Sequence, residues 1–413
     1  MIDWPSRALQ LNLLGRIRFI WQGLAPVGNV LNLPLQFLTI AIFISALFSQ
    51  YPALSFIAFV GKYLKVVFLY FTIIEAFNSQ RPIGIFLKVF MFSAFLTASF
   101  GVIQHFTGFN YSNGYFIGGD RINSFFGTAN GLGAYLLPVI AIVTHFLFRA
   151  INCRQYRILT CALSFFLVLL LVCLCWSYSR SAWIGYLVIL FVTALLDRRK
   201  LLFVGAFFLI FVLIFLPSLN NARHLQLTND HDAEVIQKAG MFQKMGAFLK
   251  QGPLCSVNDL LEQGGSGRLA FWKKAVSIIR LSPVYGTGLN TYTRMIKRDP
   301  DRRTWWYAHN SYLQMAAETG LLGLACFLWM VFVLLRYGFN SRKQIKASVI
   351  TVGHPDAHRY SWQLTFLEGA LSGLLGYLAQ SFFDNTLYAV QLNMFMWVII
   401  GMMVAVSRLN ENL

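Results

Sequence analysis

The sequence predicts an all-α, polytopic integral membrane protein of about 10–12 transmembrane helices with one long, mostly helical loop outside the membrane. Hydrophobic residues make up 57% of the 413 residues and charged residues only 12%, which is too apolar for a soluble globular protein of this length. Apolar stretches of about twenty residues, each able to cross roughly 30 Å of hydrocarbon, recur along the chain. One long segment, 218–310, interrupts this pattern and is too large to be a simple connector.

The candidate membrane spans follow one another from residue 34 to residue 407. They lie at 34–50, 52–77, 83–104, 129–149, 156–177, 181–196, 201–217, 318–336, 363–383 and 389–407. The second contains Lys62 and Lys65, so a surface helix followed by a shorter span is an alternative there. Residues 8–31 are apolar but contain Arg16 and Arg18, which favours an interfacial helix over a further span.

The lysines and arginines of the short loops predict the orientation of these spans. They gather at 149–157, at 197–200, at 342–359 and at Arg408, which we therefore expect to be cytoplasmic. By alternation, the outer face carries 105–128, 177–181, 218–310 and 384–388. The chain then divides into N-terminal transmembrane helices (1–217), a periplasmic loop domain (218–310) and C-terminal transmembrane helices (311–413).

The long loop is basic and contains helical patterns. Residues 233–250 place apolar side chains on one face and lysines on another, which predicts an amphipathic helix on the membrane surface. A second helix opens at Arg268, where the guanidinium and the free backbone N–H groups are suited to hold an anion. A phosphate-bearing lipid is the expected partner and nucleic acid is not, although simple attraction to anionic membrane lipids is an open alternative.

A histidine precedes the first helix after this loop. Ser311 and Gln314 have the spacing of a capping box, so we expect the helix to begin near Ser311 and His309 to lie just outside its positive end. A cationic ring is disfavoured there, and a neutral ring keeps a nitrogen that can accept a proton, as a general base requires. A purely structural role for His309 at the helix end is the open alternative.

Other charged residues lie at the predicted outer ends of spans. Arg121 occurs in a polar stretch, 119–130, and Arg180 lies in a tight hairpin between two apolar spans. Arginine suits phosphate recognition, although snorkelling to the interface is the alternative. Asp384 lies between the last two spans, where an isolated carboxylate is costly, so we expect it to pair with Arg180, Arg268 or His309. Capping a helix is an equally open role for Asp384.

Three stretches of the sequence, in this order, resemble one known family. They are SYSRSAWIG at 177–185, GRLAFW at 267–272 followed by Pro283 and Gly286-Thr-Gly288, and HNSYLQ at 309–314 followed by ETGLLG at 318–323, with weaker support from 119–130 and 380–385. Together they resemble the O-antigen ligase and polymerase superfamily of membrane glycosyltransferases. The ligase branch is the most similar.

The resemblance implies a metal-independent GT-C-type glycosyltransferase of the bacterial cell inner membrane with its active site on the periplasmic face. The donor would be a glycan on undecaprenyl diphosphate, and the acceptor a sugar hydroxyl of lipid A–core. The resemblance maps the catalytic residues onto Arg180, Arg268 and His309. His309 would remove the acceptor proton, the arginines would stabilise the departing diphosphate, and in-line attack would invert the anomeric centre. Weaker candidates for binding the diphosphate or glycan are Arg121, Asn310, Tyr312 and Asp384.

Other functions are compatible with the same residues. A repeat-unit polymerase and a protein O-oligosaccharyltransferase share the same site logic. A lipid-linked glycan flippase or transporter needs no base, and broken helices would favour it, but the sequence shows none clearly. His309 has no partner at metal-ligand spacing, and no metal or cofactor is expected. The six cysteines predict no structural disulfide.

Overall fold

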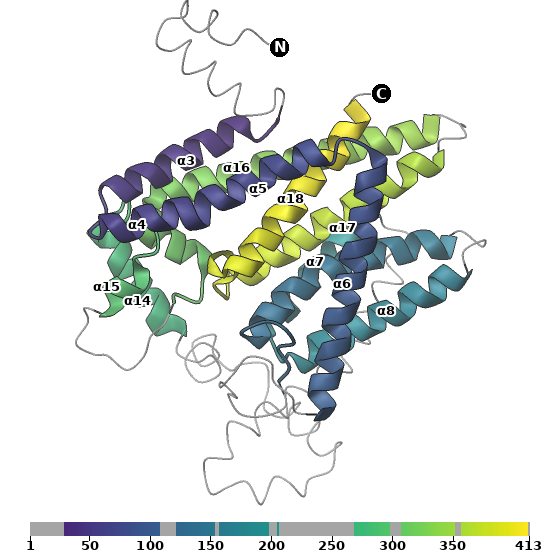
Figure 1. The fold of residues 1–413 in the computed structure, drawn as a ribbon, viewed down its shortest axis with the longest axis horizontal. Helices are drawn as coiled ribbons and strands as arrows, with labels where there is room; N and C mark the ends of the chain where they lie inside the picture. The colour runs from purple at the N-terminus through teal and green to yellow at the C-terminus, as the bar shows by residue number, and fades with distance from the viewer. Residues whose placement is uncertain are drawn as a thin grey trace, which may run out of the picture.

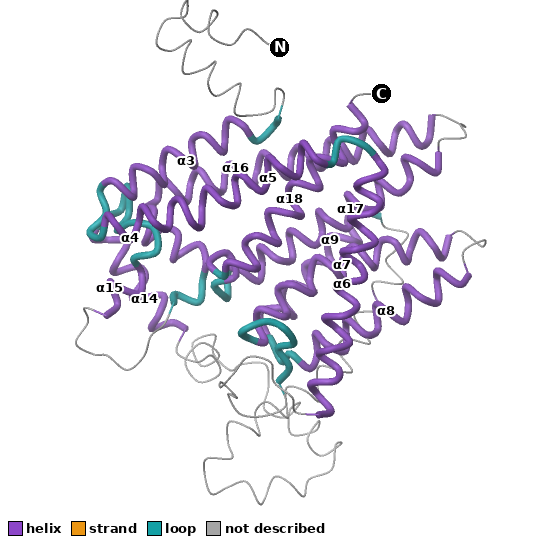
Figure 2. The backbone as a smooth tube through the Cα atoms, viewed as in Figure 1, coloured by secondary structure: helices purple, strands orange, loops and turns teal. Residues whose placement is uncertain are grey.

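The computed structural model describes residues 29–107, 121–152, 157–197, 205, 268–297, 307–351 and 357–411. Over these residues the chain forms helices and loops, with no strand (Figure 2). The elements are α3 (Asn32–Leu47), α4 (Pro52–Ala58), η1 (Phe59–Leu64), α5 (Lys65–Ala76), α6 (Gln80–Thr107), α7 (Ala129–Asn152), α8 (Arg157–Trp176), α9 (Arg180–Leu196), α14 (Arg268–Leu281), α15 (Tyr292–Lys297), α16 (Ser311–Thr351), α17 (Ala357–Ser381), η4 (Thr386–Tyr388) and α18 (Val390–Glu411).

Within the described residues, six helices are long and apolar enough to cross a membrane. They are Pro52–Ala76, Gln80–Thr107, Ala129–Ile151, Arg157–Trp176, Ser311–Ser348 and Val390–Leu409, while α3 and α9 are apolar but shorter. These helices coincide with predicted spans and confirm the prediction of an all-α, polytopic membrane protein. Most of the predicted span 201–217, most of the interfacial stretch 8–31 and the surface helix 233–250 lie outside the described residues. The total of about 10–12 spans therefore stays a prediction.

The second predicted span is one continuous helical run rather than a surface helix followed by a shorter span. Its middle, η1, is a π-helical stretch that contains Lys62. The Lys62 ammonium donates a hydrogen bond to Asn290 Oδ1 at 2.7 Å. π-Helical turns are rare, and they frequently occur at functional sites. Here the polar partner explains how an apolar span tolerates this lysine.

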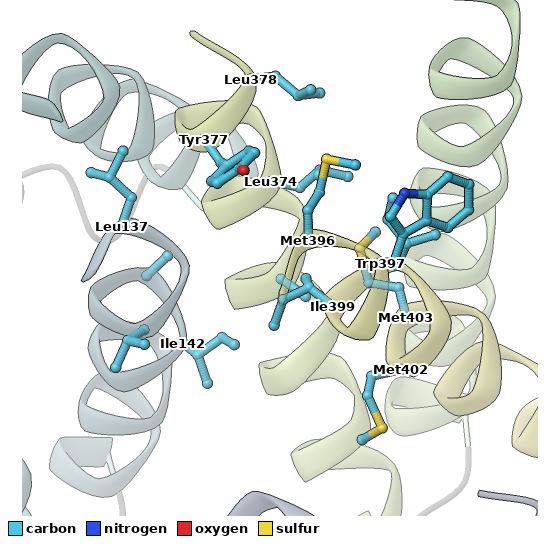
Figure 3. Packing of buried hydrophobic residues seen from close by; sticks show 14 of the residues in the cluster. Leu137, Ile142, Leu374, Tyr377, Leu378, Met396, Trp397, Ile399, Met402 and Met403 are labelled. Carbon is cyan, nitrogen blue, oxygen red and sulfur yellow. The ribbon is translucent and has the colours of Figure 1, made fainter. Parts of the chain in front are cut away.

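The bundle is held together at α17, which packs against α7, α9, α16 and α18. In Figure 1, α17 and α18 lie in the middle, with α3, α5 and α16 on one side and α6, α7 and α8 on the other. Glycines bring the backbones together, because a Cβ on Gly185 or on Gly376 would lie 2.7 Å from the carbonyl oxygen of the other. Figure 3 shows Leu374 and Tyr377 of α17 among buried side chains of α7 and α18.

Helix α16 is broken at Gly320, whose backbone has φ 73° and ψ 176°. The loop 283–288 fills the break: Thr287 N–H donates to the Ala317 carbonyl at 3.0 Å, and Leu321 N–H donates to the Pro283 carbonyl at 2.8 Å. Glycine is required because the φ is positive and a Cβ would lie 2.0 Å from the Val284 carbonyl oxygen. This break corrects the expectation that the chain contains no clearly broken helix. The sequence does not show the break because the backbone groups that it exposes are satisfied by a segment distant in sequence.

Candidate active site

His309 and Asp384 meet at the end of the bundle where α16 begins. His309 Nδ1 lies 3.5 Å from Asp384 Oδ1, and the two side chains are 27% and 15% exposed. His309 lies two residues before the start of α16 at Ser311, and Asp384 lies in the loop between α17 and η4. The backbone of His309 has φ 47°, in the left-handed region that side chains other than glycine rarely adopt. Such strain is often found at functional sites.

Asn310, and not Ser311, caps α16. The Asn310 side-chain oxygen accepts hydrogen bonds from the N–H groups of Tyr312 and Leu313, both at 3.0 Å. The helix begins at Ser311 as predicted, but the capping box on Ser311 was wrong. The Ser311 hydroxyl instead donates to the Asp384 carbonyl at 2.8 Å. It therefore ties the start of α16 to the loop that carries the carboxylate.

The Asp384 carboxyl is held as a carboxylate. Burial acts to raise its pKa, but the hydrogen bond from His309, the Asn385 N–H and the charges of His309 and Arg268 outweigh burial, so its pKa lies below the ordinary value. The Asn385 N–H donates to Asp384 Oδ1 at 2.8 Å. A neutral His309 that donates Nδ1–H to this carboxylate has Nε2 as the nitrogen that takes up a proton.

Arg121 and Arg268 interact electrostatically with Asp384, and Arg180 interacts with both of these arginines. Partial desolvation lowers the pKa of Arg121 and of Arg268, the charge of Asp384 opposes this effect, and the charge of Arg180 adds to it. Arg121 donates from Nε to the Ser177 carbonyl at 3.0 Å and from a terminal nitrogen to Asn130 Oδ1 at 3.1 Å. These bonds join its loop to the hairpin before α9. Like charges gathered around one carboxylate are typical of a site for a further anion.

The arginines come from separate elements that the local sequence positions. Arg180 is the first residue of α9, and the hydroxyl oxygen of Ser179 caps that helix by accepting from the Ala182 N–H at 3.4 Å. Arg268 is in the first turn of α14, which packs against α16. Segments far apart in the sequence thus bring Arg121, Arg180 and Arg268 to the same charged site as His309 and Asp384.

Aromatic rings line the same region. The Phe271 ring lies 5.5 Å from the His309 ring, and the Trp272 ring lies 5.6 Å from the Phe382 ring, measured between centroids. Tyr312, a weaker candidate for substrate binding, packs near Phe382 and donates its hydroxyl to the Leu378 carbonyl at 2.8 Å. Asn310, another weaker candidate, is 1% exposed and is used as the helix cap. Both residues hold the start of α16 in place.

The structure adds residues that the sequence analysis did not single out for the site. Gln314 and Glu318, which are buried, and Asn385, which is partly buried, form a hydrogen-bonded chain behind Asp384. Gln314 appeared in the sequence only as half of a capping pattern, and Asn385 only as the neighbour of Asp384. Among the described residues, no group of three or more His, Cys, Asp or Glu side chains is placed to hold a metal ion. The described cysteines 161, 173, 175 and 326 are free, while Cys153 and Cys255 lie outside the described residues.

Comparison with protein families gives one match over the region that carries most of this site. Residues 165–328 match the family described as O-Antigen ligase. The matched stretch contains Arg180, Arg268 and His309, whereas Arg121 and Asp384 lie outside it. Comparison with curated proteins gives no match.

Proposed function

We propose that this chain is an O-antigen ligase, a glycosyltransferase of lipopolysaccharide synthesis, and the match of residues 165–328 to the O-Antigen ligase family supports this proposal. It transfers a glycan from undecaprenyl diphosphate to a sugar hydroxyl of lipid A–core, without a metal ion and with inversion at the anomeric carbon. It does so in the bacterial inner membrane with the site on the periplasmic face. The family match supports ligase or polymerase chemistry in general, and the helices support a multi-pass membrane protein.

The observation that carries the proposal is the histidine–carboxylate pair beside the arginines. A base and an anion site are the two functions that this transfer needs, because the donor already contains a good leaving group. Asp384 orients His309 and stabilises the imidazolium that forms, as a carboxylate does for a catalytic histidine in general. Arg180 and Arg268 then stabilise negative charge on the departing diphosphate.

The reaction balances with these residues alone. His309 Nε2 takes the proton of the acceptor hydroxyl while the hydroxyl oxygen forms a bond to the anomeric carbon. The bond from that carbon to the diphosphate oxygen breaks, and its electron pair leaves with the lipid diphosphate. Arg121 adds positive charge to the same site, and its hydrogen bonds to Ser177 and Asn130 fix its position.

A reconstituted reaction tests this function directly. Purified protein in liposomes would receive a lipid-linked glycan that is already polymerised, together with lipid A–core, and the lipopolysaccharide would be sized on a gel. A ligase moves the whole glycan to the core in one step, and the product does not form without the core. Growth of lipid-linked glycan in the absence of lipid A–core would identify a repeat-unit polymerase. Movement of lipid-linked glycan across the bilayer without transfer would identify a flippase.

A further inference from the structure

A chain of buried hydrogen bonds leads from the catalytic pair to the break in α16. The Asn385 side-chain amide donates to Gln314 Oε1, while the Asn385 backbone N–H donates to Asp384 Oδ1. The Gln314 amide nitrogen in turn donates to Glu318 Oε1 at 3.2 Å. Gln314 and Glu318 are each 1% exposed. The Asp384 carboxylate is therefore linked to the buried carboxyl group of Glu318 through the backbone N–H and side-chain amide of Asn385 and then through the Gln314 side chain.

The far end of this chain is anchored in the loop that fills the break. Glu318 accepts the backbone N–H of Asn290 at 2.7 Å and that of Tyr292 at 3.2 Å. Its own carbonyl accepts the Gly288 N–H at 2.8 Å and the Ser45 hydroxyl at 2.7 Å. Glu318 thus holds segments from α3, α16 and the loop before α15 in one arrangement, and it is a rigid support for Gln314.

Gln314 holds the backbone on both sides of the catalytic pair. Its Oε1 accepts from the Ala308 N–H at 3.4 Å, directly before His309, as well as from Asn385, directly after Asp384. Both neighbourhoods are irregular: His309 has a positive φ, and Asn385 lies between α17 and η4. Backbone in these conformations has no helical hydrogen bonds to fix it, so a side chain has to supply them.

We propose that Gln314, together with Asn385, is a positioning residue that sets the Asp384 carboxylate against His309, with Glu318 as its anchor. This inference rests on the proposed function, because it assumes that His309 and Asp384 take part in catalysis. Gln314 does not touch the substrate in this scheme. It acts through the pair, so its loss changes the chemical step and not the binding of the diphosphate at the arginines.

The test compares two buried glutamines. Gln314→Met keeps the size and removes the hydrogen bonds. Gln363→Met is the matched control, because Gln363 is 0% exposed in α17 and its side-chain amide has no hydrogen-bond partner among the described residues. We expect kcat of glycan transfer to fall about tenfold to a hundredfold in Gln314→Met, with the KM for the lipid-linked donor unchanged, since small misplacements of reacting groups have effects of this size. Gln363→Met should keep its kcat.

A double-mutant cycle then asks whether Gln314 acts through Asn385. If the two residues share one bond, Gln314→Met combined with Asn385→Leu should lower kcat little more than either change alone. Additive losses of kcat would overturn the proposal. A change in the KM for the lipid-linked donor with no loss of kcat would also overturn it. Equal losses of kcat in Gln314→Met and Gln363→Met would show that Gln314 contributes only to the packing of the core.

A readout independent of transfer separates this inference from the proposed function. The rate of modification of His309 by diethyl pyrocarbonate at pH 7 can be followed by mass spectrometry of its peptide. Asp384 is the titratable group in contact with the ring, Arg268 and Arg121 interact electrostatically with that carboxylate, and Arg180 interacts with these two arginines. Loss of the oriented carboxylate should slow the modification several-fold in Gln314→Met, as in Asp384→Asn, and leave Gln363→Met at the wild-type rate. An unchanged rate in Gln314→Met would contradict the positioning role, even if the wild type transfers no glycan.

Discussion

His309 is not needed to cap α16, because the Asn310 amide already accepts the first free N–H groups of that helix. This removes the main structural role that the sequence left open for the histidine. What remains is a ring paired with a carboxylate, held in a strained backbone conformation beside arginine charges. The strain is consistent with selection for the placement of the ring and not for helix stability.

His309→Asn is the sharpest test of the base. Asparagine is among the residues that tolerate a left-handed conformation, so the backbone at φ 47° should be retained. We expect glycan transfer to fall by about 10²–10⁴-fold, the range of general-base contributions, while the unfolding temperature and donor binding stay near those of the wild type. Transfer rates, thermal unfolding in detergent and binding of the lipid-linked donor would be measured together. An active His309→Asn enzyme would remove the histidine from the chemistry.

The lowered pKa of Asp384 predicts how the stability of the protein depends on pH. Its pKa in the folded protein lies below the ordinary 3.8. The carboxylate therefore contributes stability that is present above that ordinary value and is lost as the pH falls through the lower, folded value. We expect the difference in unfolding temperature between wild type and Asp384→Asn to be constant from roughly pH 5 to 8 and to shrink only in more acidic solution. A difference that already declines between pH 7 and 5 would show that the carboxyl is not held ionised.

The arginines should differ from ordinary basic residues in their tolerance of lysine. Arg180→Lys keeps the charge but loses the planar fork that matches a diphosphate, so we expect transfer to fall about tenfold to a hundredfold. Arg280→Lys, on the exposed surface of α14, is the matched control and should be near wild type. Initial rates over a range of donor concentrations would separate turnover from binding. Near-normal rates in Arg180→Lys and in Arg268→Ala would withdraw their assignment to the diphosphate.

Among the elements, the broken helix α16 and the loop that fills its break set the geometry of the site. The loop 283–288 connects α14, which carries Arg268, to the helix that follows His309. Its hydrogen bonds replace those that α16 gives up at Gly320. The break is therefore a rigid joint between the arginine helix and the histidine helix. Broken helices are also found in transporters, where they face a cavity, but here the freed backbone groups bond to the loop.

A glycine in this joint should be intolerant of a side chain. Gly286 has φ 73°, and a Cβ there would lie 2.3 Å from the Glu318 carbonyl oxygen. We expect Gly286→Ala to lower the free energy of unfolding by at least about 1–2 kcal/mol and to reduce transfer as well. Gly84→Ala in α6 is the control, because no atom lies within 4 Å of its added Cβ. Thermal unfolding of both variants in detergent decides the matter, and a stable, active Gly286→Ala protein would contradict the rigid joint.

Across the bundle, residues from the predicted outer loops and residues from the predicted cytoplasmic loops form two separate groups. Arg121, Arg180, Arg268, His309 and Asp384 gather at one end of the bundle, as their common assignment to the outer face predicts. The predicted cytoplasmic segments meet elsewhere: Arg342 pairs with Glu368 at 2.8 Å and donates to the Leu196 carbonyl at 2.5 Å. The relative sidedness of these segments agrees with the distribution of lysine and arginine. Which group faces the periplasm stays a prediction.

Two native cysteines test the orientation. The sequence places Cys255 in the loop 218–310 and Cys153 in a predicted cytoplasmic loop. In single-cysteine variants, a membrane-impermeant maleimide added to cells with a permeabilised outer membrane should label Cys255 and spare Cys153. Lysis should make Cys153 reactive, which provides the control for its accessibility. Labelling of Cys153 in intact inner membranes, with Cys255 protected, would invert the topology and place the site on the cytoplasmic face.

The membrane class, most helix positions and the charged candidates of the site can be predicted from the sequence alone. Spans could be read because about twenty apolar residues are needed to cross the hydrocarbon, and that requirement is local. The start of α16 at Ser311 and the helix beginning at Arg268 followed from equally local patterns. His309, Arg180 and Arg268 were picked out by residue chemistry and family resemblance, although their roles stay predictions.

Which side chains meet depends on how the helices pack in three dimensions. The sequence leaves Asp384 with three possible partners, and folding pairs it with His309, while Arg121 and Arg268 act on the Asp384 carboxylate electrostatically. In the folded structure Asn310 caps α16, the helix is broken at Gly320, and Gln314 is hydrogen-bonded to Asn385. Each of these depends on contacts between segments distant in the chain or on competition between neighbouring polar groups. Such contacts are set by the packing of the whole bundle, and local periodicity carries no information about them.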